Sequence, residues 1–100
     1  MAYLPIKKTL QLIKNEDVII TDRPILFQLL GPEKLFVVDI TMIGNQERMK
    51  IDSMLKFKNI YLMKDEEDDD RYENKNKFLN ENKFEFIEKL SRHYNLLKLR

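Results

Sequence analysis

The stretch NENKFEFIEKLSRHYNLLKL, residues 80–99, decides the predicted fold more than any other part of the sequence. Its apolar side chains recur every three or four residues, at Phe84, Ile87, Leu90, Tyr94 and Leu97. This spacing is typical of an α-helix with one apolar face. Because an isolated helix of this length is only marginally stable in water, we expect its apolar face to pack against the rest of the chain.

The preceding part of the chain, residues 1–63, has the composition of a sheet. Short segments rich in Ile, Val, Leu and Phe alternate with turn-forming residues, which indicates strands joined by short connections. The predicted strands are residues 9–13, 18–21, 25–30, 35–43, 48–57 and 60–63. Connections of hairpin length favour antiparallel pairing between them. A break in the alternation at Ser53 and Met54 predicts a β-bulge.

Two of these segments also fit a helix. Ile6, Leu10 and Ile13 lie on one helical face, so residues 5–14 are compatible with either structure. Residues 22–31 begin with an acid, continue with a proline and end at Gly31, which is a helical pattern, although we favour a strand there. The choice between strand and helix therefore stays open for residues 6–13 and 24–30.

These elements predict one α+β domain over residues 1–100. Its sheet is a curved antiparallel sheet or a small open barrel of about five to six strands, packed by the C-terminal amphipathic helix. Residues 1–63 supply the strands, residues 64–77 an acidic and polar loop, and residues 80–99 the helix. A chain of 100 residues has enough apolar side chain for one core.

The residue types argue against an enzyme. The chain has no cysteine and a single histidine, His93, which excludes thiol chemistry and histidine metal clusters. Two glycines are too few for a glycine-rich phosphate loop. A metal-dependent hydrolase built on Asp39, Glu47 and Asp52 lacks the expected spacing, and alternation turns Asp39 outward. We therefore expect no catalytic residue, no cofactor and no metal.

The charge balance and the residue bias limit the possible partners, the cellular location and the kind of genome. Eighteen basic and seventeen acidic residues give a net charge of +1, too small for binding through bulk charge. Since no signal peptide or apolar run of about 20 residues is present, we expect a cytoplasmic protein, of a cell or of an infected host, with no membrane partner. Ten Ile, thirteen Lys and eight Asn against one Ala are typical of an AT-rich genome, that of a phage, virus, mobile element or cell.

Six consecutive carboxylates are the most conspicuous charge feature. They lack the spacing and the glycine of a calcium-binding loop, and blocks of like charge are normally solvated. A second interpretation is that they contact a basic partner. Leucines beyond the core-facing stripe of the C-terminal helix suggest a further contact with a partner protein or a second copy. The predicted partner-binding residues are Asp65, Glu66, Glu67, Asp68, Asp69, Asp70, Leu96 and Leu99.

By elimination, we expect a small non-catalytic interaction protein, such as a regulator, inhibitor or assembly factor, that binds another macromolecule. The alternative is a small nucleic-acid-binding β-barrel, in which an aromatic ring stacks on bases while lysines contact phosphates. The residues of this alternative are Lys50, Lys56, Phe57, Lys58 and Tyr61. Alternation along a half-solvated strand explains the same lysines, so this interpretation takes second place.

Overall fold

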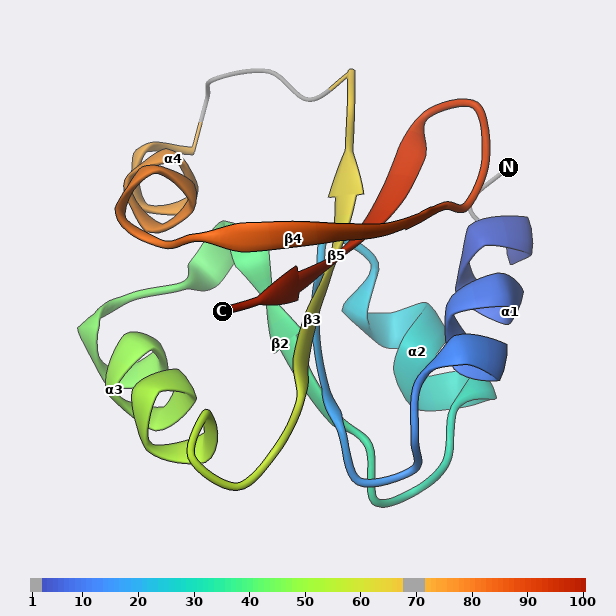
Figure 1. Cartoon of the computed structure of the whole chain (residues 1–100), viewed down its shortest axis with the longest axis horizontal. Helices are drawn as coiled ribbons and strands as arrows, with labels where there is room; N and C mark the ends of the chain where they lie inside the picture. The colour runs from blue at the N-terminus through green and yellow to red at the C-terminus, as the bar shows by residue number, and fades with distance from the viewer. Residues whose placement is uncertain (1–2, 68–71) are drawn as a thin grey trace.

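The computed structural model describes residues 3–67 and 72–100. Its elements are α1 (Tyr3–Leu12), β1 (Val18–Thr21), α2 (Pro24–Leu30), β2 (Phe36–Asp39), the 3-10 helix η1 (Ile40–Met42), α3 (Asn45–Met54), β3 (Ile60–Asp65), α4 (Glu73–Glu81), β4 (Phe84–Lys89) and β5 (Tyr94–Leu99). Over these residues the chain has an α+β fold with a five-stranded mixed sheet. Figure 1 shows α1 and α2 on one side of the sheet and α3 and α4 on the other.

The strand order is β2-β1-β3-β5-β4, and the sheet is open, with β2 and β4 at its edges. Strand β1 pairs in parallel with both β2 and β3, while β5 is antiparallel to β3 and to β4. The expected antiparallel sheet or barrel is therefore wrong. Strands β1 and β2 are joined through α2, and β2 and β3 through α3. Because these connections run in opposite directions across the sheet, right-handed crossovers place α2 and α3 on opposite faces.

Apolar cores lie on both faces of the sheet. Ile20 and Leu62 face one core, to which α3 and α4 contribute Ile51 and Phe78. The neighbouring residues along the strands face the other core, which contains Ile6, Ile13 and Phe27 from the α1 and α2 side together with Ile19 and Met63. Strands buried on both faces are apolar at consecutive positions rather than at alternate ones. Such runs predict a strand but leave its pairing direction open.

Helices replace strands in three segments. The open choice for residues 6–13 and 24–30 is resolved in favour of helix, whereas the strand predicted at residues 48–57 is wrong. Residues 9–13 belong mainly to α1, residues 25–30 to α2, and residues 48–54 to α3, so the bulge expected at Ser53 and Met54 is absent from this described segment. Helix α2 has Pro24 in its first turn, and Gly31 N donates to Phe27 O to close its end. At the start of α3 the Glu47 side chain accepts from Gly44 N at 2.9 Å. These local signals mark where the two helices begin and end.

The expected C-terminal helix is also wrong, because residues 84–99 form the β4–β5 hairpin. Leu90 N and Ser91 N both donate to Tyr94 O, which closes the turn. The apolar residues of this hairpin recur every three or four positions, as they would in a helix. Leu96 and Leu99 nevertheless face cores on opposite sides of the sheet. Pairing β5 with β3 buries both residues, whereas in the predicted helix they would share a face outside the core-facing stripe.

The predicted acidic loop of residues 64–77 is shorter than expected within the described residues. Lys64 and Asp65 belong to β3, and α4 begins at Glu73. Phe78 anchors α4 in the core, with its ring in edge-to-face contact with that of Phe84 at 6.1 Å. Across residues 3–67 and 72–100, no helix is long and apolar enough to span a membrane.

Candidate functional site

A hollow of about 340 Å³ runs along β2 beside α3. A neighbouring hollow shares Phe36, Lys50 and Met54 with it, so that the two form one surface. We call this surface the β2–α3 groove. The residues that line it are Phe36, Val37, Val38, Asp39, Met42, Glu47, Met49, Lys50, Ile51, Ser53 and Met54.

Large apolar side chains in the groove are open to solvent. Phe36 is 40% exposed, Met49 is 68% exposed and Met42 is 74% exposed. Burying a side chain of this size stabilises a contact by roughly 1.5 to 3 kcal/mol. Methionine is flexible at three torsions and adapts its shape to different partners. Exposed apolar surface concentrated in a hollow is typical of a binding site.

The edge of β2 presents unpaired backbone to this groove. Phe36 N donates to Asp17 O of the chain before β1 at 3.2 Å. Because the direction of backbone groups alternates along a strand, Val38 also faces β1, whereas Val37 directs its N–H and C=O away from the sheet. An extended segment of another chain can pair with such an edge by adding a strand.

The opposite edge of the sheet is protected. Strand β4 carries Glu85, Glu88 and Lys89, and its pairing with β5 shifts register between Phe86 and Glu88. Charged side chains and bulges of this kind hinder pairing with a further strand. Strand β2 has one charged residue, Asp39 at its end, and an even register with β1. The two edges therefore differ in their suitability for strand addition.

The partner-binding residues predicted from sequence do not form one surface. Leu96 is fully buried and Leu99 is 3% exposed, both in β5, so the expectation that they extend an exposed apolar stripe is wrong. Asp65 ends β3, Glu66 contacts Asn95 by a hydrogen bond, and the Glu67 carboxylate lies 3.0 Å from His93 Nδ1. Asp68, Asp69 and Asp70 lie outside the described residues.

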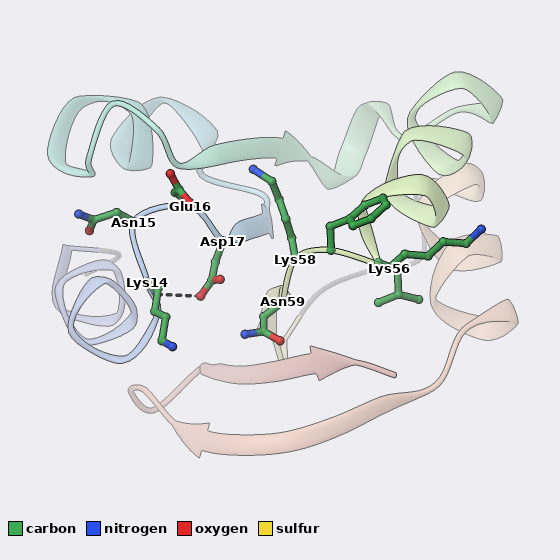
Figure 2. A pocket seen from close by; sticks show the side chains of 9 residues that line it. Lys14, Asn15, Glu16, Asp17, Lys56, Lys58 and Asn59 are labelled. Atoms are coloured by element: carbon green, nitrogen blue, oxygen red, sulfur yellow. Dashed lines mark hydrogen bonds between the residues drawn. The ribbon is translucent and has the colours of Figure 1, made fainter.

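The residues of the nucleic-acid alternative are likewise divided. Lys56, Phe57 and Lys58 lie in the loop between α3 and β3, and they line a hollow of about 770 Å³ with residues 14–17 (Figure 2). Lys50 belongs to the β2–α3 groove instead. Tyr61 is half-buried in β3, where burial and then the charge of Asp17 raise its pKa. The sequence missed the contribution of residues 14–17, because they are distant along the chain.

Charged side chains also gather at the carboxyl ends of β1 and β3. Asp22 follows β1 directly, and Asp65 is the last residue of β3. Strands β2 and β3 flank β1, so the connections that follow β1 and β2 run in opposite directions across the sheet. Ligands of α/β sheets often bind at the carboxyl ends of the strands where the direction of the connections reverses. The Tyr94 hydroxyl donates to Asp22 Oδ2 at 3.4 Å, and Lys75 of α4 is 2% exposed.

Burial dominates the electrostatics of this cluster, and the neighbouring charges oppose it only in part. Burial raises the pKa of Asp22, the charge of Arg23 lowers it, and that of Asp65 raises it further. Burial lowers the pKa of Lys75, while the charges of Asp22 and Asp65 act in the opposite direction. Lys75 also lies 5.4 Å above the ring of Tyr72. We interpret the cluster as a link between the strand ends, α4 and β5.

The sequence assigned Asp22 and Tyr94 structural roles in predicted helices and did not point to Lys75, so this cluster was not predicted. A detectable signal was the acidic residue at the end of each apolar strand, at Asp22 and at Asp65. Carboxyl ends of neighbouring parallel strands meet at one edge of a sheet, so a parallel prediction would have brought these two residues together. The antiparallel prediction separated them.

The carboxylates of the hydrolase alternative have structural contacts. Asp39 Oδ1 accepts from Thr41 N at 3.0 Å and from Thr41 Oγ1 at 2.7 Å, which fixes the start of η1. Glu47 caps α3, and Asp52 is exposed on the same helix. Among the residues described, no three metal-ligating side chains gather into a group.

Comparison with known proteins gives no relative: no family model, curated protein or solved structure matches this chain.

Proposed function

We propose that this chain is a non-catalytic binding protein that takes an extended segment of another protein onto the edge of β2. The observation that carries the proposal is the coincidence of an unprotected edge strand with the exposed apolar lining of the β2–α3 groove. Strand addition would give the partner main-chain hydrogen bonds, and the groove would take its side chains. A regulator, inhibitor or assembly factor acting in the cytoplasm fits this mode of binding.

The charges beside the groove suggest the chemistry of the partner segment. Asp39 and Glu47 already accept hydrogen bonds from Thr41 and Gly44. Lys50 is exposed beside Phe36 and Met54, where its ammonium group can meet a carboxylate. We therefore expect a segment with alternate apolar side chains and one acidic residue. Apolar contact would supply most of the affinity, because an exposed ion pair contributes at most about 1 kcal/mol.

The experiment is a selection from a displayed library of random peptides of roughly 12 residues, long enough for one strand. The expected result is a set of peptides with alternating apolar residues that bind the wild-type chain. Phe36→Lys should weaken their binding by at least about 10-fold, since it removes an apolar contact worth more than about 1.4 kcal/mol. Enrichment of no sequence family would contradict the proposal.

A matched control lies at the other edge of the sheet. Phe86 of β4 is 58% exposed, so Phe86→Lys makes the same chemical change on a strand that already carries charges. This variant should bind the selected peptides as tightly as the wild type. Equal weakening by Phe36→Lys and Phe86→Lys would contradict the assignment of the site to β2.

A second copy of the chain is the competing occupant of the β2 edge. Light scattering at a protein concentration of about 100 μM distinguishes self-association from binding of another protein, because even weak self-association populates a dimer at this concentration. The proposal predicts a monomer in wild-type and Phe36→Lys samples alike. A wild-type dimer that Phe36→Lys dissociates would contradict binding of another protein and would assign the edge to self-association.

A further inference from the structure

The hollow at the amino ends of β1 and β3 is separate from the β2–α3 groove, and it differs from it in chemistry. It lies between the loop that precedes β1 and the loop that precedes β3. Figure 2 shows Lys58 and Asn59 at the centre of the view, with Lys14 and Asn15 on one side and Lys56 on the other. Its volume is about 770 Å³, whereas the two hollows of the groove measure about 340 and 390 Å³.

Ordered backbone holds both loops that frame the hollow. Asp17 N donates to Lys14 O at 3.1 Å, and Asp17 Oδ2 accepts from Lys14 N at 2.7 Å. Phe57 N and Lys58 N donate to Met54 O at 2.9 and 2.8 Å. A further bond joins the loops directly, from Val18 N to the Asn59 carbonyl at 3.0 Å. The side chains around the hollow are therefore presented from a fixed frame.

Two acidic side chains line the hollow, Glu16 and Asp17. Glu16 is exposed, and its carboxylate lies 3.6 Å from the ammonium group of Lys34, which is exposed as well. Asp17 is 6% exposed and accepts from the backbone of its own turn. Lys14 and Lys56 are exposed and Lys58 is half-exposed, so positive charge dominates the accessible rim.

An aromatic ring stands between two of these lysines. Phe57 is 86% exposed, the largest exposed fraction among the large apolar residues of residues 3–67 and 72–100. The positions of Lys14, Lys56 and Lys58 near the ends of α1 and α3 are favourable for basic residues in any case, because helix C-termini are negative. That effect accounts for lysines and leaves the exposed ring unexplained.

We propose that this hollow is a binding site for single-stranded nucleic acid. The phenyl ring of Phe57 would stack on a base, the three lysines would contact phosphates, and the amides of Asn15 and Asn59 would meet base edges. A duplex offers no exposed base face, which is why the proposal commits to a single strand. The shared chemistry, a nucleobase with phosphate, also occurs in free nucleotides, and the experiment separates these two sources.

The test measures fluorescence anisotropy of a labelled, mixed-sequence single-stranded oligonucleotide of about 15 nucleotides, the upper range of single-strand site sizes. Three phosphate contacts predict an affinity that falls by roughly 20-fold between about 50 mM and about 200 mM salt. Phe57→Ala should weaken binding by about 5-fold or more through loss of stacking. No anisotropy change at about 100 μM protein in the low-salt buffer would overturn the proposal.

Charge variants separate a local site from bulk attraction. Lys56→Glu and Lys58→Glu should each weaken oligonucleotide binding by several-fold. Lys89→Glu changes the net charge equally, but Lys89 pairs with Asn95 near the carboxyl end of β3, at the opposite end of the sheet from the hollow. This control should bind as the wild type does, and an equal loss in all three variants would overturn the site.

Two further readouts complete the test. Adenosine monophosphate, added at the same total concentration of nucleotides as the oligonucleotide supplies, should displace little of the bound oligonucleotide. Full displacement would overturn the assignment to single-stranded nucleic acid. Circular dichroism should show wild-type folding for Phe57→Ala, whose ring is solvent-exposed. Phe36→Ser removes an apolar contact of the β2–α3 groove without adding a charge beside Asp17, whose carbonyl accepts from Phe36 N. It should leave oligonucleotide binding unchanged, so that failure of this site and failure of the β2–α3 groove are told apart.

Discussion

The hydroxyl of Tyr94 donates to the carboxylate of Asp22, with oxygen–oxygen distances of 3.4 and 3.5 Å. The two residues are separated by 72 positions in sequence. Tyr94 begins β5 and Asp22 follows β1, with β3 lying between these strands. This contact therefore links the C-terminal hairpin to the parallel part of the sheet, and it gives a first prediction on stability.

Tyr94→Phe should lower the free energy of unfolding by about 1 kcal/mol, because the ring stays packed while a hydrogen bond to a carboxylate is lost. Urea denaturation followed by circular dichroism measures the change. Tyr3→Phe is the matched control, since Tyr3 is 47% exposed and the same oxygen is removed there. A loss in Tyr94→Phe no larger than in the control would contradict the described contact.

Asp22→Asn should become progressively more stable relative to the wild type as the pH rises from about 3 to 7. The pKa of Asp22 is raised in the fold, chiefly by burial, with a further increase from Asp65 and opposing effects of Arg23 and Tyr94. A raised folded pKa favours the protonated form, so its stabilisation is present below the unfolded pKa and is lost as the pH rises through the folded pKa. Urea titrations across this pH range measure the difference, and a constant difference would contradict burial of the carboxyl group.

Gly31→Ala should destabilise the chain by about 1 to 3 kcal/mol, the usual range for an added methyl group in packed surroundings. A Cβ at Gly31 would lie 2.6 Å from the Phe27 carbonyl oxygen, which closes helix α2 and is unable to move freely. Thermal unfolding measures the effect. Gly44→Ala provides the control, because its Cβ would meet only the flexible end of Glu47 at 3.1 Å. An equal loss of stability in Gly31→Ala and Gly44→Ala would contradict the close approach of Gly31 to the Phe27 carbonyl oxygen.

Leu96→Ala should cost about 2 to 5 kcal/mol, because Leu96 is fully buried in the core beside α1 and α2. Leu55 is 37% exposed, and Leu55→Ala should cost much less. Chemical denaturation of the two variants tests whether residues 94–99 form a core strand. A small effect of Leu96→Ala would support the amphipathic helix that the sequence predicted and would contradict β5.

The sequence predicted the α+β class and the strands at residues 18–21 and 60–63, since short β-branched segments between turn residues are distinctive. It failed for α3, where Ile51 is the one fully buried residue of the helix and gives little periodicity. It failed for β4 and β5 because the pairing of β5 with β3 overrides the local spacing of apolar residues. Distant pairings of this kind leave no local trace.

The candidate site was predictable only in part. Lys56, Phe57 and Lys58 are adjacent in sequence, so the sequence grouped them, but it placed Lys56 and Phe57 in a strand, whereas all three lie in the loop before β3. The contribution of Lys14 and Asn15 depends on the parallel pairing of β1 with β3, which brings their amino ends together. The β2–α3 groove depends on β2 being an edge strand, and strand order is a property of the whole topology.

The central claim, strand addition at β2, is tested most directly by amide hydrogen exchange at Val37 with and without a selected peptide. Because the Val37 N–H points away from β1, it should exchange rapidly in the free chain and slow by at least about 10-fold when the peptide is bound. Val38, which faces β1, should change far less. Val37→Pro removes this donor without breaking a bond to β1, and it should abolish peptide binding while the chain stays folded. Unchanged exchange at Val37 in the saturated complex would contradict the claim.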